Sequence, residues 1–181
     1  DVDEDAWYHE AVDYALDNGL MSGVSDREFA PGSTLTRAMV AQMLYSLADK
    51  PELGSNLGYP YADVMPGSWY VDAVYWARQN GYITGYNAEQ FGPDDALTRE
   101  QLAVILYSYA QDQGYDTDGG ITLGNYLDAD AVSQWAVAAL EWAVDAGLIT
   151  GRGEGVLAPA GTATRAEIAQ IMMNFLEKVA E

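Results

Sequence analysis

The sequence predicts an all-α protein built from three helix-loop-helix repeats. One observation is a phrase that occurs three times: residues 6–23, 68–85 and 134–151 read "AWYHEAVDYALDNGLMSG", "SWYVDAVYWARQNGYITG" and "QWAVAALEWAVDAGLITG". The other is a constant spacing, because a threonine–arginine pair places its arginine 30 residues after the tryptophan in every copy. Self-similarity at a period of tens of residues indicates a repeat architecture.

Each repeat begins with an amphipathic helix that ends at a glycine. In the first copy Val12, Ala15 and Leu16 share one helical face, and the later copies repeat this pattern. Turn-forming residues follow in each copy and predict a loop. Glycine accepts the left-handed conformation of a helix stop, which predicts helix ends at Gly19, Gly81 and Gly147.

A second helix starts at the threonine of each pair. An N-cap threonine accepts a hydrogen bond from a backbone amide of the first turn, and a Glu or Gln three residues later completes a capping box. That spacing occurs at Gln101 and Glu167 but not in the first copy, where Met39 stands. We therefore expect three helix caps, at Thr36, Thr98 and Thr164.

The repeats need one another to bury their apolar faces. One helix pair cannot enclose its own apolar stripe, so the copies pack either as one closed domain with pseudo-threefold symmetry or as a linear solenoid. We place the repeats at 1–50, 61–110 and 126–181, joined by linkers at 51–60 and 111–125. The second helices should supply buried contacts at Ala41, Leu44, Leu102, Ile105, Ile168 and Ile171.

The charge balance excludes several classes of function. Eight basic and 28 acidic residues give a net charge of −20, which argues against binding nucleic acid or an anionic membrane surface. No apolar run is long enough for membrane insertion, and the absence of cysteine excludes disulfides. We expect no cofactor, no metal and no catalytic residue, since His9 is the only histidine and the alternating Asp1, Asp3 and Asp5 read as solvated.

The arginine of each pair is harder to explain by structure. Arg37, Arg99 and Arg165 fall in a first helical turn, where the macrodipole disfavours a cation. One interpretation is an ion pair with an acidic residue of a neighbouring repeat. The other is that arginine and helix N-terminus together form a positive site for an anionic ligand. Because a first-turn cation adds little to helix stability, replacing it by alanine is expected to leave folding nearly intact.

Two further sets of residues are candidates for ligand contact. Tryptophan can stack on a sugar ring, but at helical spacing it is more often a core residue, and the core interpretation is favoured for Trp7, Trp69 and Trp135. The glycines after the first helix are primarily turn residues, although a missing side chain also lets a ligand approach the backbone. These secondary candidates are Gly23, Gly85 and Gly151.

The three units resemble S-layer homology repeats over nearly all of the chain. The pattern of that family is an aromatic-x-Asp opening, a tryptophan, a helix ending in Gly-Ile-x-x-Gly, a Phe-x-Pro loop and Thr-Arg-Ala-Glu. This sequence has "YADV" at 61–64, then "GLMSG", "GYITG" and "GLITG", "FAP" and "FGP", and finally "TRAM", "TREQ" and "TRAE". The resemblance implies a three-pronged, pseudo-threefold spindle around a central helical bundle.

The resemblance also implies a function. Repeats of this family bind secondary cell-wall polysaccharide, often through a pyruvylated sugar, and anchor a longer surface protein non-covalently at the extracellular face of the wall, as in an S-layer. A pyruvyl ketal carries a carboxylate, which a guanidinium pairs with bidentately, so the arginines are interpreted as anion receptors. Leu157 stands where the first two loops have Phe29 and Phe91, so the third site is expected to be weaker or differently shaped. The alternatives are a helical-repeat scaffold for protein–protein interaction on the cell surface and a glycan-cleaving enzyme.

Overall fold

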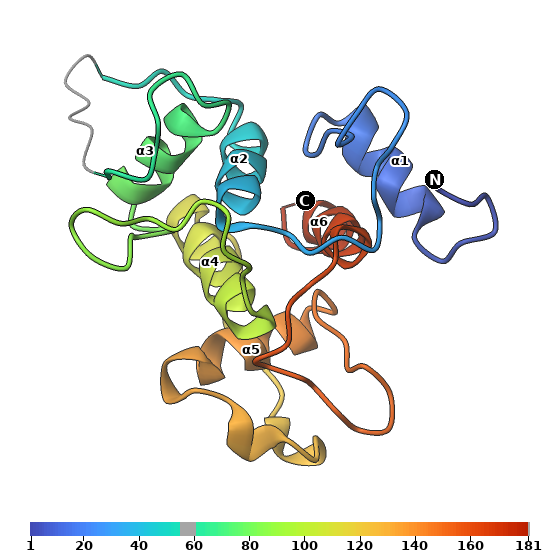
Figure 1. Cartoon of the computed structure of the whole chain (residues 1–181). Coiled ribbons are helices and arrows are strands. Elements are labelled where there is room, and N and C mark those ends of the chain that lie inside the picture. The colour runs from blue at the N-terminus through green and yellow to red at the C-terminus, as the bar shows by residue number, and fades with distance from the viewer. Residues whose placement is uncertain (55–60, 181) are drawn as a thin grey trace.

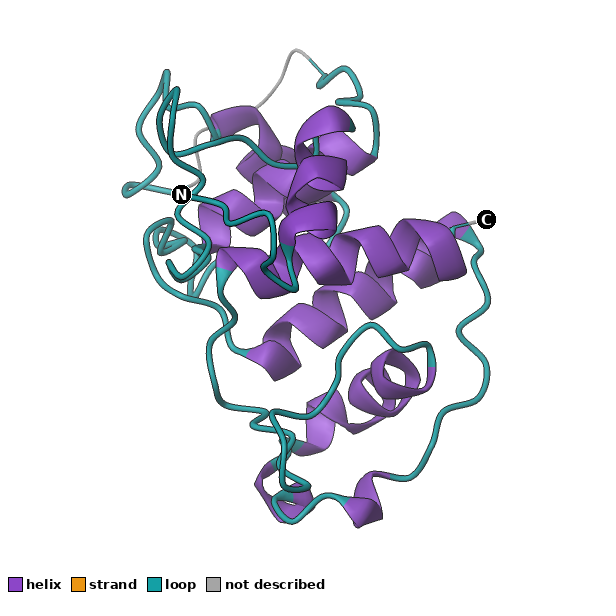
Figure 2. Cartoon of the chain, turned by 90° about the vertical axis from the view of Figure 1, so that its right-hand side faces the viewer, coloured by secondary structure: helices purple, strands orange, loops and turns teal. Residues whose placement is uncertain are grey.

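The computed structural model describes residues 1–54 and 61–180, and this described part is all-α, as the sequence predicts. Within those ranges it contains six α-helices, three short 3-10 helices and no β-strand (Figure 1; Figure 2). Residues 55–60 of the expected 51–60 linker lie outside the described residues. The helices are α1 His9–Asp17, α2 Arg37–Leu47, α3 Val71–Gln79, α4 Arg99–Gln113, η1 Leu123–Asn125, η2 Ala129–Ala131, η3 Gln134–Ala136, α5 Val137–Asp145 and α6 Arg165–Lys178.

Three of these helices, α2, α4 and α6, lie near the centre, and α1, α3 and α5 lie in three outer lobes (Figure 1). Each outer helix packs on the central helix of the preceding repeat: α3 on α2, α5 on α4, and α1 on α6. The helix pairs therefore form between repeats and not within the helix-loop-helix units of the sequence pattern. Because α1 packs on α6, the first and last repeats are in contact, which is the closed arrangement and not a linear solenoid.

The first amides of each central helix bond to the loop that precedes the central helix of the next repeat, and the third repeat bonds to the first. Amides at the first two positions of a helix have no intrahelical acceptor, and in all three central helices the acceptor is a carbonyl of the next repeat's loop. Arg37 N donates to Asp95 O at 2.9 Å and Ala38 N to Pro93 O at 3.1 Å. The equivalent bonds run from Arg99 and Glu100 to Gly161 and Pro159, and from Arg165 and Ala166 to Ser33 and Pro31. These helix N-termini are consequently not open anion sites, which corrects that part of the second interpretation of the arginines.

Helix starts and stops follow the local sequence. Thr98 and Thr164 accept hydrogen bonds from Gln101 N and Glu167 N in complete capping boxes. Thr36 accepts a hydrogen bond from Met39 N, and Met39 returns none. The three predicted stops have left-handed backbones, with φ of 64°, 75° and 67° at Gly19, Gly81 and Gly147.

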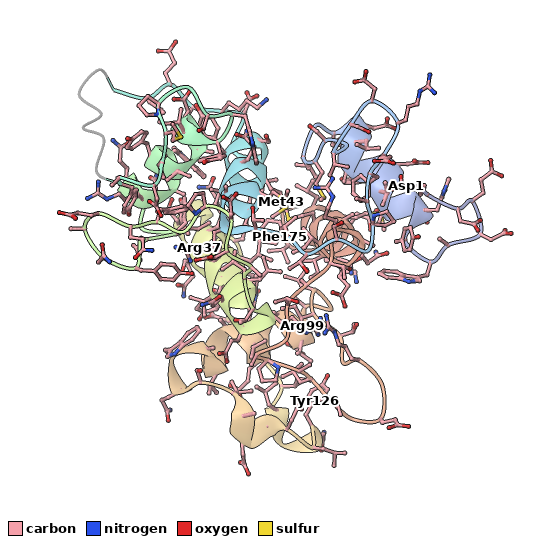
Figure 3. All side chains as sticks on the ribbon, in the orientation of Figure 1. Asp1, Arg37, Met43, Arg99, Tyr126 and Phe175 are labelled. Atoms are coloured by element: carbon pink, nitrogen blue, oxygen red, sulfur yellow. The ribbon has the colours of Figure 1, made fainter. Side chains whose placement is uncertain are left out.

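One core is shared by the three repeats. The six residues predicted to be buried in the second helices are all at most 5 % exposed. Met43 of α2 and Phe175 of α6 lie near the meeting point of the central helices (Figure 3), and each is 2 % exposed or less. Because apolar side chains from all three repeats are buried in this one core, we expect the repeats to unfold together.

An aspartate near the start of each repeat holds the loop that precedes the central helix. Asp1 Oδ1 and Oδ2 accept hydrogen bonds from Phe29 N at 2.8 Å and Ala30 N at 2.6 Å. Asp63 accepts the same pair of bonds from Phe91 N and Gly92 N, and Asp128 from Leu157 N and Ala158 N. The expectation that Asp1 is merely solvated is therefore wrong, because two amides 28 and 29 residues away need its acceptors.

Candidate functional site

The three arginines join neighbouring repeats through backbone carbonyls. Each donates from Nε and Nη2 to two carbonyl oxygens of the next repeat's loop, in the cyclic order of the helices. The bonds are Arg37 to Phe91 O (2.9 Å) and Thr84 O (2.6 Å), Arg99 to Leu157 O (3.1 Å) and Thr150 O (2.5 Å), and Arg165 to Phe29 O (2.7 Å) and Ser22 O (2.5 Å). We call this pair of bonds the carbonyl clamp.

The clamp explains why a cation is placed in a disfavoured helical turn. The three arginines are only 4–6 % exposed, and burial lowers the pKa of each below its ordinary value. A buried guanidinium requires acceptors for its N–H groups, and the loop carbonyls supply them. Neither interpretation drawn from the sequence names carbonyls as the main partners. Of the three guanidinium nitrogens of each arginine, only Nη1 takes no part in the clamp.

The surroundings of Nη1 differ among the three copies. Arg165 Nη1 lies 3.9 Å from the sulfur of Met39, a weak acceptor. Arg99 Nη1 lies 3.9 Å from Glu167 Oε1. The Arg37 guanidinium lies over the ring of Tyr86, at 4.6 Å from its centroid. Its contact with Phe91, at 4.8 Å, is shared by Arg165, which lies over Phe29 at 4.5 Å.

In the third repeat the acidic neighbour of Arg99 is also engaged by a second arginine. Arg152 donates from Nε and Nη2 to the carboxylate of Glu167, at 3.2 and 2.9 Å, and from Nη2 to Thr162 O at 2.6 Å. Glu167 also accepts from Thr164 N as the capping-box residue. A carboxylate of the protein thus stands beside Arg99 Nη1, where Arg165 has only a thioether.

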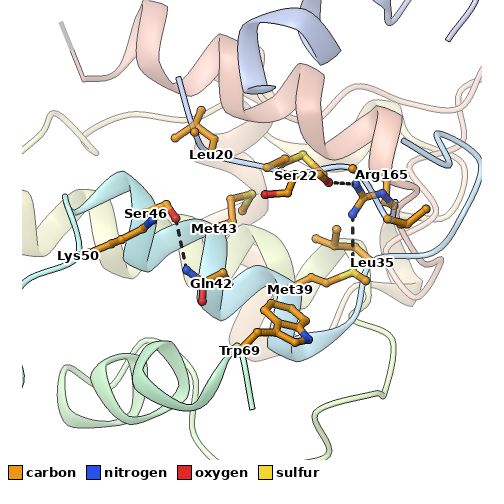
Figure 4. A pocket seen from close by; sticks show the side chains of 14 residues that line it. Leu20, Ser22, Leu35, Met39, Gln42, Met43, Ser46, Lys50, Trp69 and Arg165 are labelled. Carbon is orange, nitrogen blue, oxygen red and sulfur yellow. Dashed lines mark hydrogen bonds between the residues drawn. The ribbon is translucent and has the colours of Figure 1, made fainter. Parts of the chain in front are cut away.

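A cavity of about 560 Å³ opens at Arg165. It is built from all three repeats: residues 19–24 and α2 of the first, Trp69 of the second and Arg165 of the third (Figure 4). Gly23, Trp69 and Arg165, one member of each set of candidates from the sequence, therefore meet at one place. The lining residues are Gly19, Leu20, Met21, Ser22, Gly23, Val24, Leu35, Met39, Gln42, Met43, Ser46, Lys50, Trp69 and Arg165.

The charge of this cavity is opposite to that of the chain. Its described lining contains two cations, Arg165 and Lys50, and no acidic residue, whereas the chain carries 28 acidic residues and a net charge of −20. A concave site lined by one sign of charge attracts ligands of the other sign. Gln42 and Ser46 add uncharged polar groups and share a 3.5 Å hydrogen bond.

The tryptophans lie on the surface, which corrects the core interpretation. Trp7, Trp69 and Trp135 are 64 %, 61 % and 58 % exposed. The rings of Trp7 and Trp69 contact the next tyrosine, Tyr8 or Tyr70, edge to face, with centroids 5.3 and 5.1 Å apart. Helical spacing misled here, because each tryptophan precedes the first residue of its α-helix and is not on the buried face.

The candidate glycines are required by space and not by a left-handed backbone. A Cβ on Gly23 would lie 2.6 Å from Ser25 O, and one on Gly85 would lie 2.6 Å from Gln90 O. At Gly151 the nearest atom would be Val156 O, at 2.9 Å. These glycines let the loop fold tightly back on itself, and Gly23 alone of the three lines the cavity at Arg165.

Sequence reasoning missed Lys50 and gave no structural role to Asp1, Asp63 and Asp128, although the aromatic-x-Asp opening was a signal for Asp63. Lys50 is one of two lysines in the chain, which was the available signal. The described residues contain no helix able to span a membrane and no group of three or more His, Asp or Glu side chains arranged for a metal ion.

The comparisons agree with the repeat pattern. The sequence profile of the S-layer homology domain matches residues 1–39, 60–103 and 125–169. Exoglucanase XynX of Acetivibrio thermocellus is 30 % identical over 97 % of this chain and 16 % of that protein. The surface-layer 125 kDa protein of Lysinibacillus sphaericus is 31 % identical over 94 % of this chain and 14 % of that protein. A cellulosome-anchoring protein of Acetivibrio thermocellus is 26 % identical over 88 % of this chain and 36 % of that protein. The chain thus spans only a minor part of these relatives.

Proposed function

The chain belongs to the S-layer homology domain family, which places it at the cell surface in association with the cell wall. From this premise we propose that it is a non-catalytic module that anchors a larger exported protein by binding secondary cell-wall polysaccharide. The enzymatic activity named for some relatives is not carried over, because the match to XynX covers 16 % of that protein. The ligand that we propose is an acidic sugar of the polymer, in particular a pyruvylated one.

The observation that carries the proposal is the charge reversal at the cavity. In a chain of net charge −20, a cavity lined by Arg165, Lys50 and no described acidic residue favours an anionic ligand. The exposed ring of Trp69 offers an apolar face to the other side of a sugar. A volume of about 560 Å³ is within the usual range of small-ligand pockets.

The arginine contributes through the nitrogen that the clamp does not use. Nε and Nη2 of Arg165 are held by Phe29 O and Ser22 O, so the guanidinium is fixed before any ligand arrives. Fixed donors lose less entropy on binding than mobile ones. A sugar carboxylate would approach Nη1 beside Met39, without displacing either carbonyl. This geometry favours a single charge-assisted hydrogen bond and not the bidentate pair inferred from the resemblance.

Gly23 and the corresponding Gly85 and Gly151 enter the proposal as contacts of the backbone. Gly23 borders the cavity. A Cβ there would meet Ser25 O and Glu28 O, so the missing side chain lets the loop turn tightly and brings its backbone to the cavity wall. We propose Arg37 and Arg99, together with Trp135 and Trp7, as the equivalent contacts in the other two positions. Tyr86 over Arg37 and Glu167 beside Arg99 make these positions weaker anion receptors.

The test is calorimetry on purified wall polysaccharide that has been stripped of protein, before and after mild acid removal of pyruvyl groups. We expect binding to the intact polymer, a loss of at least tenfold in affinity after the acid treatment, and weaker binding as salt rises. Equal affinity for both polymers would contradict recognition of the pyruvyl carboxylate. No binding to either polymer would overturn the anchoring function itself. Release of reducing sugar during the incubation would support the glycan-cleaving alternative.

A further inference from the structure

The central helix of the first repeat ends differently from its two counterparts. α2 ends at Leu47, whereas α4 and α6 continue to Gln113 and Lys178. The position 13 residues after the clamp arginine is Lys50 in the first repeat, Asp112 in the second and Lys178 in the third. Asp112 and Lys178 are helical, but Lys50 lies beyond the helix end.

Lys50 has a backbone conformation that its residue type does not favour. Asp49 and Lys50 are consecutive left-handed residues, with φ of 59° and 48°. Aspartate tolerates this region after a helix, but a long unbranched side chain has no local hydrogen bond to compensate for it. The turn is held by Asp49 N donating to Ser46 O at 3.0 Å and Lys50 N donating to Tyr45 O at 2.9 Å. Unfavourable backbone conformations persist where the surroundings impose them and are frequent at ligand sites.

The turn places Lys50 at the edge of the cavity at Arg165. The two cations lie at opposite ends of the cavity, with α2 running between them (Figure 4). Gln42 and Ser46 lie along that path, and Trp69 lies nearer to the Arg165 end (Figure 4). A ligand that reaches both cations must therefore extend along α2 past two uncharged polar side chains.

The second repeat has reversed the charge at the equivalent position. Asp112 accepts a 2.5 Å hydrogen bond from the hydroxyl of Tyr82, and Tyr82 replaces the leucine found at 20 and 148. An acidic residue in the last turn of α4 is disfavoured by the helix dipole, and the tyrosine bond compensates for it. A cation at this position is therefore not a requirement of the fold.

We propose that Lys50 is a second cationic contact for the saccharide and selects an acidic oligosaccharide with two separated negative charges. The inference rests on the proposed function and deepens it. One charge pairs with Arg165 Nη1 and the other with Lys50 Nζ, while the sugar between them lies along Gln42 and Ser46. A saccharide with a single carboxylate satisfies one end of the cavity only.

The experiment compares two probes by calorimetry: a methyl glycoside with one pyruvyl ketal and a tetrasaccharide wall fragment with two. The variants are Lys50→Gln, Lys50→Gly and, as a matched control, Lys178→Gln. We expect the unmodified chain to bind the doubly charged probe more tightly. Lys50→Gln should weaken binding of that probe by about two- to fivefold, the scale of an ion pair made by an exposed side chain. Binding of the singly charged probe should be unchanged. Lys178→Gln should change neither.

Lys50→Gly separates the side chain from the backbone turn. Glycine adopts the left-handed region without strain, so this variant should melt at a higher temperature than the unmodified chain and lose the same affinity as Lys50→Gln. Unchanged affinity of Lys50→Gln for the doubly charged probe would overturn the role of Lys50 but not the proposed function. An equal loss in Lys178→Gln would overturn it as well, because the effect would then be one of net charge. Failure of the unmodified chain to bind either probe would instead overturn the proposed function, and this inference with it.

Discussion

The surroundings of Arg165 and Arg99 share the carbonyl clamp but differ in the side chain that lies beside Nη1. Both guanidinium groups are buried and hold two carbonyls of the next repeat with Nε and Nη2. They differ in the third residue of the neighbouring central helix, which is Met39 beside Arg165 and Glu167 beside Arg99. The shared part joins repeats, and the variable part decides whether the remaining nitrogen faces a thioether or a carboxylate.

This comparison separates two tasks that the sequence presents as one. The clamp needs an arginine in all three repeats, because each arginine holds one of the three contacts between neighbouring repeats. Ligand recognition, as we propose it, uses only Nη1 of the arginine and depends on neighbouring residues that vary between copies. A repeated motif therefore does not imply an equally repeated binding site.

The largest effect is expected from breaking the shared clamp. Arg165→Ala and Arg99→Ala should each destabilise the chain by about 3–6 kcal/mol, because each removes two hydrogen bonds to a charged group worth about 1.5–3 kcal/mol apiece. The clamp therefore leads to the opposite prediction from helix position alone, which predicts that such variants fold almost normally. Urea unfolding followed by circular dichroism measures the change, with Arg27→Ala at an exposed arginine as the control. A loss below about 1 kcal/mol in both variants would show that the carbonyls do not depend on the arginines.

The next effect comes from exchanging the variable residue. Met39→Glu places a carboxylate beside Arg165 Nη1 and should weaken binding of a pyruvylated fragment about tenfold or more, through repulsion of the ligand carboxylate. The clamp is untouched, so stability should change little. Met65→Glu is the matched control, because Met65 is 69 % exposed and does not line the cavity. Equal affinity of Met39→Glu and the unmodified chain would mean that the ligand does not approach Nη1.

The reverse exchange sharpens the same comparison. Glu167→Met removes the carboxylate beside Arg99 and should raise the number of fragment molecules bound per chain. It also removes a capping-box partner and the ion pair with Arg152, so a loss of about 1 kcal/mol in stability is expected. An unchanged stoichiometry would indicate that Glu167 does not prevent ligand binding at Arg99.

A smaller effect is expected from the tryptophan at the cavity. Trp69→Ala should weaken binding by about 0.5–1.5 kcal/mol, the scale of an aromatic contact, and leave the melting temperature nearly unchanged because the ring is 61 % exposed. Trp7 holds the corresponding place beside Arg99 by repeat order, and Trp7→Ala should weaken binding less than Trp69→Ala does. Equal losses for Trp69→Ala and Trp7→Ala would mean that the two regions bind alike.

The smallest effect concerns pH in the Arg99 region. The pKa of Asp128 is lowered, first by the hydrogen bond from Leu157 N and also by that from Ala158 N. Its contribution to stability is therefore present above the unfolded-state pKa and is lost as the pH falls through the lower folded-state pKa. Asp128→Asn should be less stable than the unmodified chain at pH 7, with a difference that shrinks toward pH 3. Urea midpoints across this range provide the measurement, and a constant difference would contradict the role of the charge.

The sequence pattern allowed much of the fold to be predicted, because local rules decide it. Threonine caps, glycine stops and the apolar face of the second helices depend on neighbours within four residues. The tryptophans were misread for the same reason: their helical spacing is local, but their exposure depends on what packs over them. The hydrogen bonds of Asp1 to residues 29 and 30 leave no local signal at all.

By itself the sequence determined three repeats, six helices, their ends and the arginine at each central helix start. Only the tertiary structure decided which repeat each helix packs against, that the arginines hold carbonyls, and that Gly23, Trp69, Lys50 and Arg165 meet at one cavity. The physical reason is range. Helix formation is governed by contacts a few residues apart, whereas Arg165 meets Phe29 and Ser22 across 136 and 143 residues, a pairing that only closure of the ring creates.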